Sequence, residues 1–279
     1  MARLPSPVAE FILFGLKQAW ACLFGGAMLS ALIVTKFAWS ANWPIQRYDF
    51  LFMLALTIQI LMLALRLESL SEVKVIVVYH LVGTIMEVFK VHVGSWSYPE
   101  PALIAIGGVP LFSGFMYGSI GSYMARAIRV FDMRFTHFPR RVWTLALSTA
   151  IYANFFGHHF TFDFRWLLFA WTVLLFRRVR IYFTVDVCIR WMPLVVAAIL
   201  TSFFLWIAEN VGTATGTWLY PSQRTWQLVS LEKMGSWYLL LFVSFTLVTL
   251  VLPPRSPEFQ LSEPADRDEI VHTKRSASQ

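Results

Sequence analysis

Apolar residues in this chain gather into eight runs separated by short polar segments. A helix of roughly 20 apolar residues crosses the ~30 Å core of a bilayer, and fewer suffice where polar ends reach the headgroups. Lipid offers no partners to free backbone N–H and C=O groups, so each run is expected to be helical. The eight runs are residues 19–35, 50–65, 73–89, 111–128, 143–156, 166–176, 192–207 and 237–252. They predict an all-α, polytopic membrane helix bundle with about eight transmembrane helices.

The segments outside these runs are short or polar. Residues 1–10 form an N-terminal segment, and residues 11–20 either extend the first helix or lie along the membrane interface. Lys17 interrupts the approach to the first run, which argues against a cleaved signal peptide. Residues 177–191 suggest an amphipathic interfacial helix. Residues 253–279 are rich in Pro, Ser and charge, which predicts a disordered tail.

Composition and charge agree with a membrane protein. Of 279 residues, 57% are hydrophobic and only 14% are charged, which excludes an ordinary soluble domain. With the N-terminus in the cytoplasm, 16 of the 23 Lys and Arg residues fall on inside segments and six on outside ones, Lys17 being uncounted. We therefore expect a multipass protein of the inner membrane with both termini cytoplasmic. The net charge of +7 is a topology signal, and it favours membrane lipids as partners over nucleic acid.

One short motif occurs twice. The stretch GSWSYPEP begins at Gly94, and GTWLYPSQ begins at Gly216, 122 residues later. The same offset relates the acids Glu87 and Glu209. The shared pattern is Glu-x6-Gly-x-Trp-x-Tyr-Pro, with five identities at one gapless spacing. This predicts two repeats of four helices, residues 11–130 and 143–252, which run the same way through the membrane and form a site between them.

The two acids are the predicted catalytic residues. Glu87 and Glu209 each lie near the outer end of an apolar helix, where an ionised carboxylate is costly. The structural alternative for Glu87 is a salt bridge with Lys90, three residues on. The motif aromatics are candidates for substrate binding, although aromatic rings at the headgroup level also anchor helices. These aromatics are Trp96, Tyr98, Trp218 and Tyr220.

Further polar residues are expected around the same site. His80 shares a helix face with Glu87 but lies deeper, and Asn154, His158 and His159 lie toward the outside. A metal site is one alternative for the histidines, but no His-x2-3-His box exists, so we expect neither a metal nor another cofactor. On the opposite side, the segment ALRLESLSEVK is expected to form a charged turn with local ion pairs.

Several of these segments resemble a known family. The stretches RYDFLFMLALTIQILMLALRLE, GSWSYPEPALIAIGGVPLFSGFMY, YANFFGHHF and AENVGTATGTWLYP are similar to the bacterial membrane proteins grouped as domain of unknown function 817. The resemblance extends to about Pro253. It implies a multipass membrane protein and no particular activity.

A more distant resemblance suggests a chemistry. Heterodimer-type lycopene cyclases and carotenoid hydratases share an acid, a Gly-x-Trp-x-aromatic turn and a Gly-x-Pro-Leu step, matched here by Glu87, Gly94, Trp96, Tyr98 and residues 108–111. The two glutamates that follow in the cyclases are replaced by Phe112 and Ser113. The resemblance implies acid–base chemistry on an isoprenoid, while this departure argues against cyclisation itself.

Two functions follow from these observations, and a scaffold or membrane-assembly factor without a substrate is a third alternative. The first is a non-redox enzyme that uses Glu87 and Glu209 as proton donors or acceptors on an isoprenoid or another lipid. The second is a transporter or permease for a small solute, which needs polar residues along a path through the membrane. Only Gln59 and His80 lie deep enough for such a path, which counts mildly against transport.

Overall fold

The computed structural model describes residues 6–40, 42–221, 223 and 227–257. This part of the chain is mostly helical. Seven of the eight apolar runs fall mainly on one helix each, and the first run, residues 19–35, is divided between two. The helices are α1 (Ser6–Ala21), α2 (Leu23–Ala38), α3 (Arg47–Ala64), α4 (Leu70–His92), α5 (Phe112–Val130), α6 (Arg141–Gly157), α7 (Arg165–Phe176), α8 (Leu194–Ala214) and α9 (Leu231–Val251). The strands are β1 (Ala105–Ile106), β2 (Val109–Pro110), β3 (Arg134–Thr136), β4 (Arg180–Thr184) and β5 (Ile189–Pro193).

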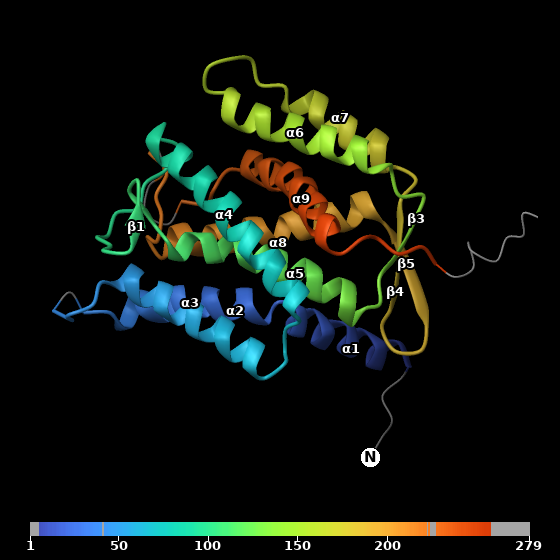
Figure 1. Cartoon of the computed structure of the whole chain (residues 1–279), viewed down its shortest axis with the longest axis horizontal. Coiled ribbons are helices and arrows are strands. Elements are labelled where there is room, and N and C mark those ends of the chain that lie inside the picture. Colours follow the sequence, from blue (N-terminus) through green and yellow to red (C-terminus); the bar gives the residue numbers. More distant parts are fainter. Residues whose placement is uncertain (1–5, 41, 222, 224–226, 258–279) are drawn as a thin grey trace, which may run out of the picture.

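Helix α5 occupies the middle of the bundle (Figure 1). It packs against α1 to α4 and against α9, while α6 and α7 pack on α9 at one side of the molecule. The β1–β2 hairpin lies at one end of the bundle, and the sheet formed by β3, β4 and β5 lies at the other (Figure 1). We call these the hairpin end and the sheet end.

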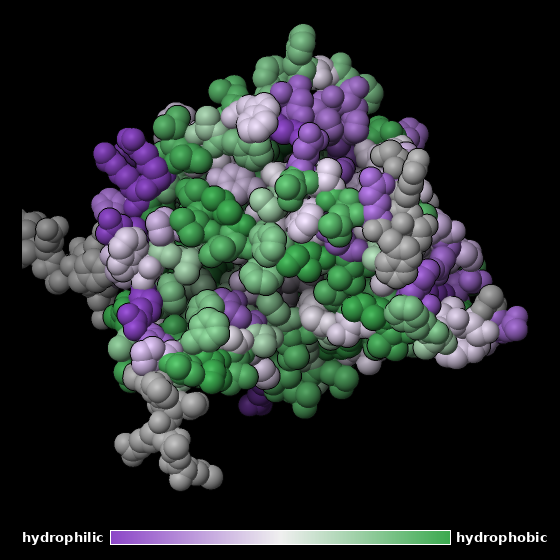
Figure 2. Space-filling model, turned by 180° about the vertical axis from the view of Figure 1, so that it is seen from behind, coloured by the Kyte–Doolittle hydropathy of each residue, from purple (hydrophilic) through white to green (hydrophobic). Residues whose placement is uncertain are grey.

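The helices differ in their suitability to cross a membrane. Among the described residues, four helices are long and apolar enough to do so, namely α3, α4, α8 and α9; the bent pair α1–α2 would make a fifth. Helix α5 carries many Gly and Ser residues, and α6 and α7 are shorter. Large apolar side chains are exposed to the surroundings, such as Ile60, Ile85 and Phe204. Figure 2 shows mostly apolar side chains across the middle of one face and most of the hydrophilic ones toward its edges, as expected for a membrane protein.

Glycines explain how α5 can sit so close to α4. A Cβ built at Gly114 would lie 2.4 Å from the His80 ring, and one at Gly121 would lie 2.8 Å from Val75. Likewise, a Cβ at Gly83 of α4 would lie 2.6 Å from the Tyr117 ring. Small residues let helices approach closely inside membranes, where burial from water cannot drive their association. Because protein rather than lipid surrounds α5, its sequence need not be strongly apolar.

The first run is preceded by a separate helix. Helices α1 and α2 meet at Cys22 with a bend of 71°. Residues 11–20 therefore belong to α1, which departs sharply from the direction of α2 and does not simply extend it. Helix α1 is tied to the sheet end, because Lys17 donates to the carbonyl of Thr184 (3.0 Å) and Glu10 pairs with Arg190 (2.7 Å).

The prediction of an interfacial helix at residues 177–191 is wrong. This segment forms the antiparallel β4–β5 hairpin, and β4 also pairs with β3. Burial alternates along β4, where Ile181 and Phe183 are buried and Arg180 is exposed. This period of two, with aromatic and β-branched residues, is the pattern of a strand. The many arginines in this segment indicated an amphipathic helix, whereas the alternation of apolar and polar residues indicates a strand.

The predicted disordered tail begins at residue 253. Residues 253–257 are described, and the carbonyl of Arg255 accepts a hydrogen bond from the backbone N–H of Phe135 (2.8 Å). This contact places the start of the tail beside β3 at the sheet end. Residues 258–279 lie outside the described part of the chain.

Candidate functional site

Two similar turns follow α4 and α8. Helix α4 ends at His92 and α8 at Ala214, and each is followed after one residue by a glycine with positive φ. The φ angle is +74° at Gly94 and +64° at Gly216, a backbone region that glycine enters without steric cost. These glycines end the helices and turn each motif back over the last turns of its own helix.

Glu87 is held by three hydrogen-bond donors. Its Oε2 accepts from Trp96 Nε1 (2.7 Å) and from the Tyr98 hydroxyl (2.8 Å), and its Oε1 accepts from the Tyr117 hydroxyl (2.6 Å). The side chain is buried, with 4% of the residue exposed. The alternative salt bridge with Lys90 does not form, because the motif turn brings its own donors to the carboxylate.

Glu209 has the matching contacts. Its Oε1 accepts from Trp218 Nε1 (2.8 Å) and from the Tyr220 hydroxyl (2.6 Å), and the residue is 6% exposed. The position that corresponds to Tyr117 is Leu239, which has no hydroxyl. The two acids thus share one design but differ in one respect. Donors engage both oxygens of Glu87, whereas both of these bonds to Glu209 fall on Oε1.

The two turns are joined to each other. Ser97 and Leu219 form an antiparallel bridge in which each N–H donates to the other's carbonyl, at 3.0 and 2.9 Å. These residues are themselves 122 positions apart. The Trp96 and Tyr220 rings also meet edge to face at 6.1 Å. A mutual exchange between corresponding residues is what a local twofold relation would produce.

Arg47 explains the acid in the first motif. It lies at the start of α3, is 3% exposed, and donates to Glu100 (2.6 Å) of the first motif and to the Thr217 hydroxyl (3.3 Å) of the second. The adjacent Tyr48 hydroxyl donates to the carbonyl of Thr217 (2.7 Å). Glu100 thus belongs to a clamp that holds both turns onto α3. The sequence does not reveal this role of Arg47, because Glu100 and Thr217 lie more than 50 residues away from it.

Both acids face one cavity of about 390 Å³. Its walls combine the motif aromatics with apolar and hydroxyl side chains from α5, α8 and α9, among them Ser113, Met116, Leu205 and Leu240. This volume lies within the range of ligand pockets in proteins, and the mixed lining resembles such pockets. The geometry can therefore surround a small apolar molecule with two carboxyl groups and several aromatic rings.

Charged and polar side chains complete the lining of the cavity. Lys90 Nζ donates to the carbonyl of Phe155 (2.6 Å) and lies 2.9 Å from His159 Nε2. The rings of His158 and His159 lie against each other with centroids 4.1 Å apart and a tilt of 35° between their planes. Burial, followed by the charge of Lys90, lowers the pKa of His159, so its ring is neutral at pH 7. The described residues include no group of three or more His, Cys, Asp or Glu side chains that could hold a metal ion.

The structure brings most of the predicted site residues together. Those that line the cavity are Glu87, Glu209, Trp96, Tyr98, Trp218, Tyr220, Asn154, His158 and His159. His80 is the exception, since its ring packs against Phe115 at 4.7 Å and against Gly114, away from the cavity wall. Helical spacing placed His80 near the face of Glu87, but α5 packs so closely there that it separates the ring from the cavity.

Sequence reasoning missed Tyr117, Lys233 and Trp237, which also line the cavity. Tyr117 lies mid-helix in α5, and nothing in its local sequence distinguishes it from a core aromatic residue. Trp237 and Lys233 occur near the start of α9, where aromatic and basic residues are ordinary interfacial anchors. Only the fold shows that these three residues meet Glu87 and Glu209.

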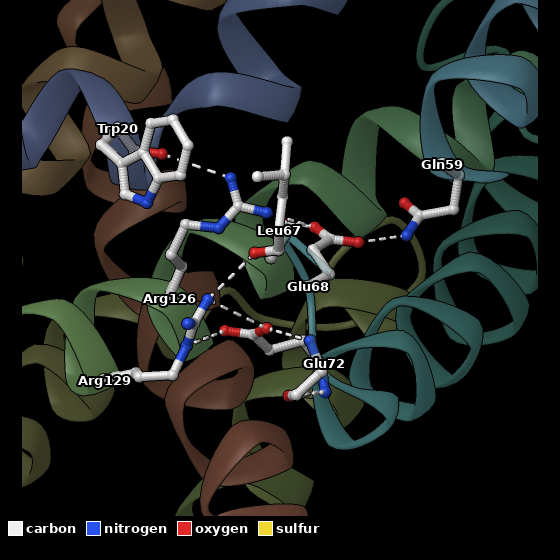
Figure 3. Close-up of polar contacts among 9 residues, drawn as sticks. Trp20, Gln59, Leu67, Glu68, Glu72, Arg126 and Arg129 are labelled. Atoms are coloured by element: carbon white, nitrogen blue, oxygen red, sulfur yellow. Dashed lines mark hydrogen bonds and ion pairs between the residues drawn. The ribbon is translucent and has the colours of Figure 1, made fainter. Parts of the chain in front are cut away.

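A second polar cluster lies at the far ends of α3, α4 and α5 (Figure 3). Glu68, in the turn between α3 and α4, accepts hydrogen bonds from Arg126 (2.6 Å), Ser122 (2.7 Å) and Gln59. Glu72 caps the start of α4 and pairs with Arg129 of α5 (3.0 Å). The prediction of local ion pairs is therefore wrong, since both acids pair with arginines more than 50 positions away. Gln59 belongs to this cluster and does not line the cavity.

Comparisons with known proteins give a family and no activity. A family model described as "Protein of unknown function (DUF817)" matches residues 10–245. An "Uncharacterized protein YoaT" from Bacillus subtilis (strain 168) is 42% identical over 242 residues, which cover 86% of this chain and 91% of that protein. No solved structure matches the chain.

Proposed function

The chain belongs to the DUF817 family of proteins of unknown function, and we propose that this member is a membrane enzyme. Its reaction would move protons on an isoprenoid or another lipid substrate without a redox cofactor. One observation carries the proposal: Glu87 and Glu209, each bound by a Trp and a Tyr of its own motif, face a single cavity.

Glu209 is the better candidate for the proton-transferring group. Its Oε2 takes no part in the hydrogen bonds from Trp218 and Tyr220, which both go to Oε1, although the Trp237 indole also interacts with this carboxyl group. That oxygen can present a proton to a substrate double bond and take one back from a neighbouring carbon. Loss of a proton from the resulting cation to the Glu209 carboxylate gives an isomer. Attack of water on the cation, with one proton of that water passing to the carboxylate, gives an alcohol. Neither outcome needs an oxidant or reductant.

Glu87 would act as the partner acid on the opposite wall. Because donors hold both of its oxygens, its position is fixed more firmly than that of Glu209. Its negative charge would stabilise a cationic intermediate. The faces of Trp96, Trp218, Tyr98 and Tyr220 would add cation–π stabilisation, which is stronger where water is excluded.

We further propose that all eight predicted runs cross the membrane, as two parallel repeats covering residues 11–130 and 143–252. The matched contacts of the two motifs and the exchange between Ser97 and Leu219 support this repeat. The first and last described residues lie near the sheet end, which also holds arginines of the β3–β4–β5 sheet. Under the positive-inside rule this end would face the cytoplasm of a bacterial inner membrane, so that the cavity faces outward.

The substitution Glu209→Gln tests the chemistry. We expect it to lower turnover at least ~100-fold while expression in the membrane persists, because an amide cannot deliver a proton. Lipids extracted from cells that make each protein would be separated by chromatography and weighed by mass spectrometry. The wild type should generate an isomer of a cellular lipid or a species that differs by one water.

The matched control is Glu10→Gln, at a carboxylate of α1 that pairs with Arg190 and is absent from the cavity lining. It should leave the lipid profile of the wild type intact. Undiminished turnover in Glu209→Gln would remove the mechanism. An unchanged lipid profile combined with solute uptake by wild-type proteoliposomes would favour the transporter alternative instead. Gln59 and His80, the residues expected along a transport path, do not line the cavity.

A further inference from the structure

Lys90 is a buried cation that lacks an anionic partner. Only 2% of the residue is exposed, yet no described carboxylate lies within ion-pair distance of its Nζ. Its ammonium group donates to the carbonyl of Phe155, meets Nε2 of the neutral His159, and lies 3.9 Å from the centroid of the Phe155 ring. An ammonium has three N–H donors, and these contacts use two. Buried charges are ordinarily paired with an opposite charge, and Lys90 has no such partner among the described residues.

The surroundings of Lys90 are suited to receive such an anion. The second lysine of the cavity, Lys233, lies close enough for the two positive charges to repel each other. Lys233 also lies near Glu209 and Glu232, and Arg165 is paired with Asp163 (2.8 Å), so these cations already have acidic neighbours. Among the described Lys and Arg residues of the cavity, Lys90 has no acidic side chain paired with it. The Ser95 hydroxyl lies 3.2 Å from His159 Nε2, which places another donor beside Lys90.

The two halves of the cavity differ at this position. The residue that corresponds to Lys90 in the second half is Gly212. A Cβ there would lie 2.0 Å from the Trp218 ring, so the space that a side chain would need is filled by the tryptophan. At this position, therefore, only the first half can offer a cation. A ligand with one charged end would bind in one orientation, despite the similarity of the two acids.

We infer that Lys90, with Ser95 and Lys233, binds the oxyanion headgroup of an amphiphile whose apolar chain enters the cavity toward Glu87 and Glu209. The headgroup chemistry is that of a phosphate or a carboxylate, which an ammonium and a hydroxyl both recognise. Chemical conversion of the apolar chain rests on the proposed function, whereas binding of the headgroup is independent of it.

Equilibrium binding tests this inference separately from catalysis. Purified protein in a neutral detergent would be titrated in a calorimeter with dodecyl phosphate, dodecanoate and dodecanol, and with inorganic phosphate alone. We expect at least one of the two charged amphiphiles to bind at least ~10-fold more tightly than dodecanol, the tenfold step corresponding to about 1.4 kcal/mol. The stronger of the two identifies the headgroup, and inorganic phosphate should bind more weakly than dodecyl phosphate because it lacks a chain.

Three variants locate the site. Lys90→Met should abolish the preference for a charged headgroup, Lys90→Arg should retain most of it, and Lys74→Met, at an exposed lysine of α4, should leave it unchanged. If Lys90→Met does not fold, Lys233→Met and Ser95→Ala should each weaken anion binding several-fold. Glu209→Gln should keep the preference for a charged amphiphile over dodecanol even where turnover is lost, which separates headgroup binding from catalysis. Equal affinity for dodecanol and both charged amphiphiles, or wild-type binding by a folded Lys90→Met protein, would overturn the inference.

Discussion

At the scale of single residues, the site depends on aromatic hydrogen-bond donors that reach the acids because a glycine leaves room for the ring. Trp218 reaches Glu209 because its ring packs closely against Gly212, where a Cβ would lie 2.0 Å from the ring. The motif spacing predicted that the acids and aromatics belong together, since glutamate, tryptophan and tyrosine recur at one offset. It could not predict Tyr117 or Arg47, whose roles arise from contacts between distant segments.

Gly212→Ala tests this arrangement. The added methyl group would push the Trp218 ring away and weaken its hydrogen bond to Glu209. We expect a loss of about 1–3 kcal/mol in the free energy of unfolding, as is typical of overpacking. The measurement is thermal unfolding in detergent, followed by tryptophan fluorescence. Gly26→Ala is the matched control: it also lies within a helix, but has no atom within 4 Å of its added Cβ, and it should leave stability unchanged or raise it slightly.

At the scale of elements, the helices were readable from the sequence and the sheet was not. Eight apolar runs predicted eight helices, because backbone groups in lipid leave little choice. The β4–β5 hairpin escaped notice because its arginines dominated the interpretation of residues 177–191, although Ile181 and Phe183 alternate as in a strand. The ends of α3, α4 and α5 are joined by pairs such as Glu68 with Arg126, which sequence spacing cannot reveal (Figure 3).

Arg126→Met tests the importance of that pair for the bundle. Both side chains are fully buried, so removal of the guanidinium leaves Glu68 as an uncompensated charge. We expect a loss of about 3–5 kcal/mol in the free energy of unfolding. Arg129→Met is the comparison, because Arg129 is half exposed and water can reach its place beside Glu72. Chemical denaturation in detergent should show a clearly smaller loss for Arg129→Met, and equal losses would contradict this account.

At the scale of the whole molecule, the orientation in the membrane follows from charge. The arginines of the sheet end predict that it faces the cytoplasm, while the loop before α3 faces outward. Cys188 lies exposed in the β4–β5 hairpin and reports on one end; Asn42 is exposed at the other. This orientation stays a prediction from charge, and charge alone cannot indicate which helices pack against one another.

Labelling of intact cells with an impermeant maleimide tests the orientation. In a Cys22→Ser background, native Cys188 should react only after the cells are permeabilised, because the hairpin would lie in the cytoplasm. With Cys22 and Cys188 both replaced by Ser, Asn42→Cys should react without permeabilisation. The reverse labelling pattern would indicate the opposite orientation in the membrane, with the cavity on the cytoplasmic side.

The bridge between Ser97 and Leu219 has a consequence for how molecules reach the cavity. Each turn provides the backbone partner of the other. Movement of either turn away from the cavity would therefore break both bridge hydrogen bonds and disturb the Trp96–Glu87 and Trp218–Glu209 contacts. The bridged turns therefore close this side of the cavity. We therefore expect ligands to enter laterally from the bilayer, near the end of α6 that precedes His158 and His159. The apolar chain would enter first, and the polar headgroup would stay at the entrance.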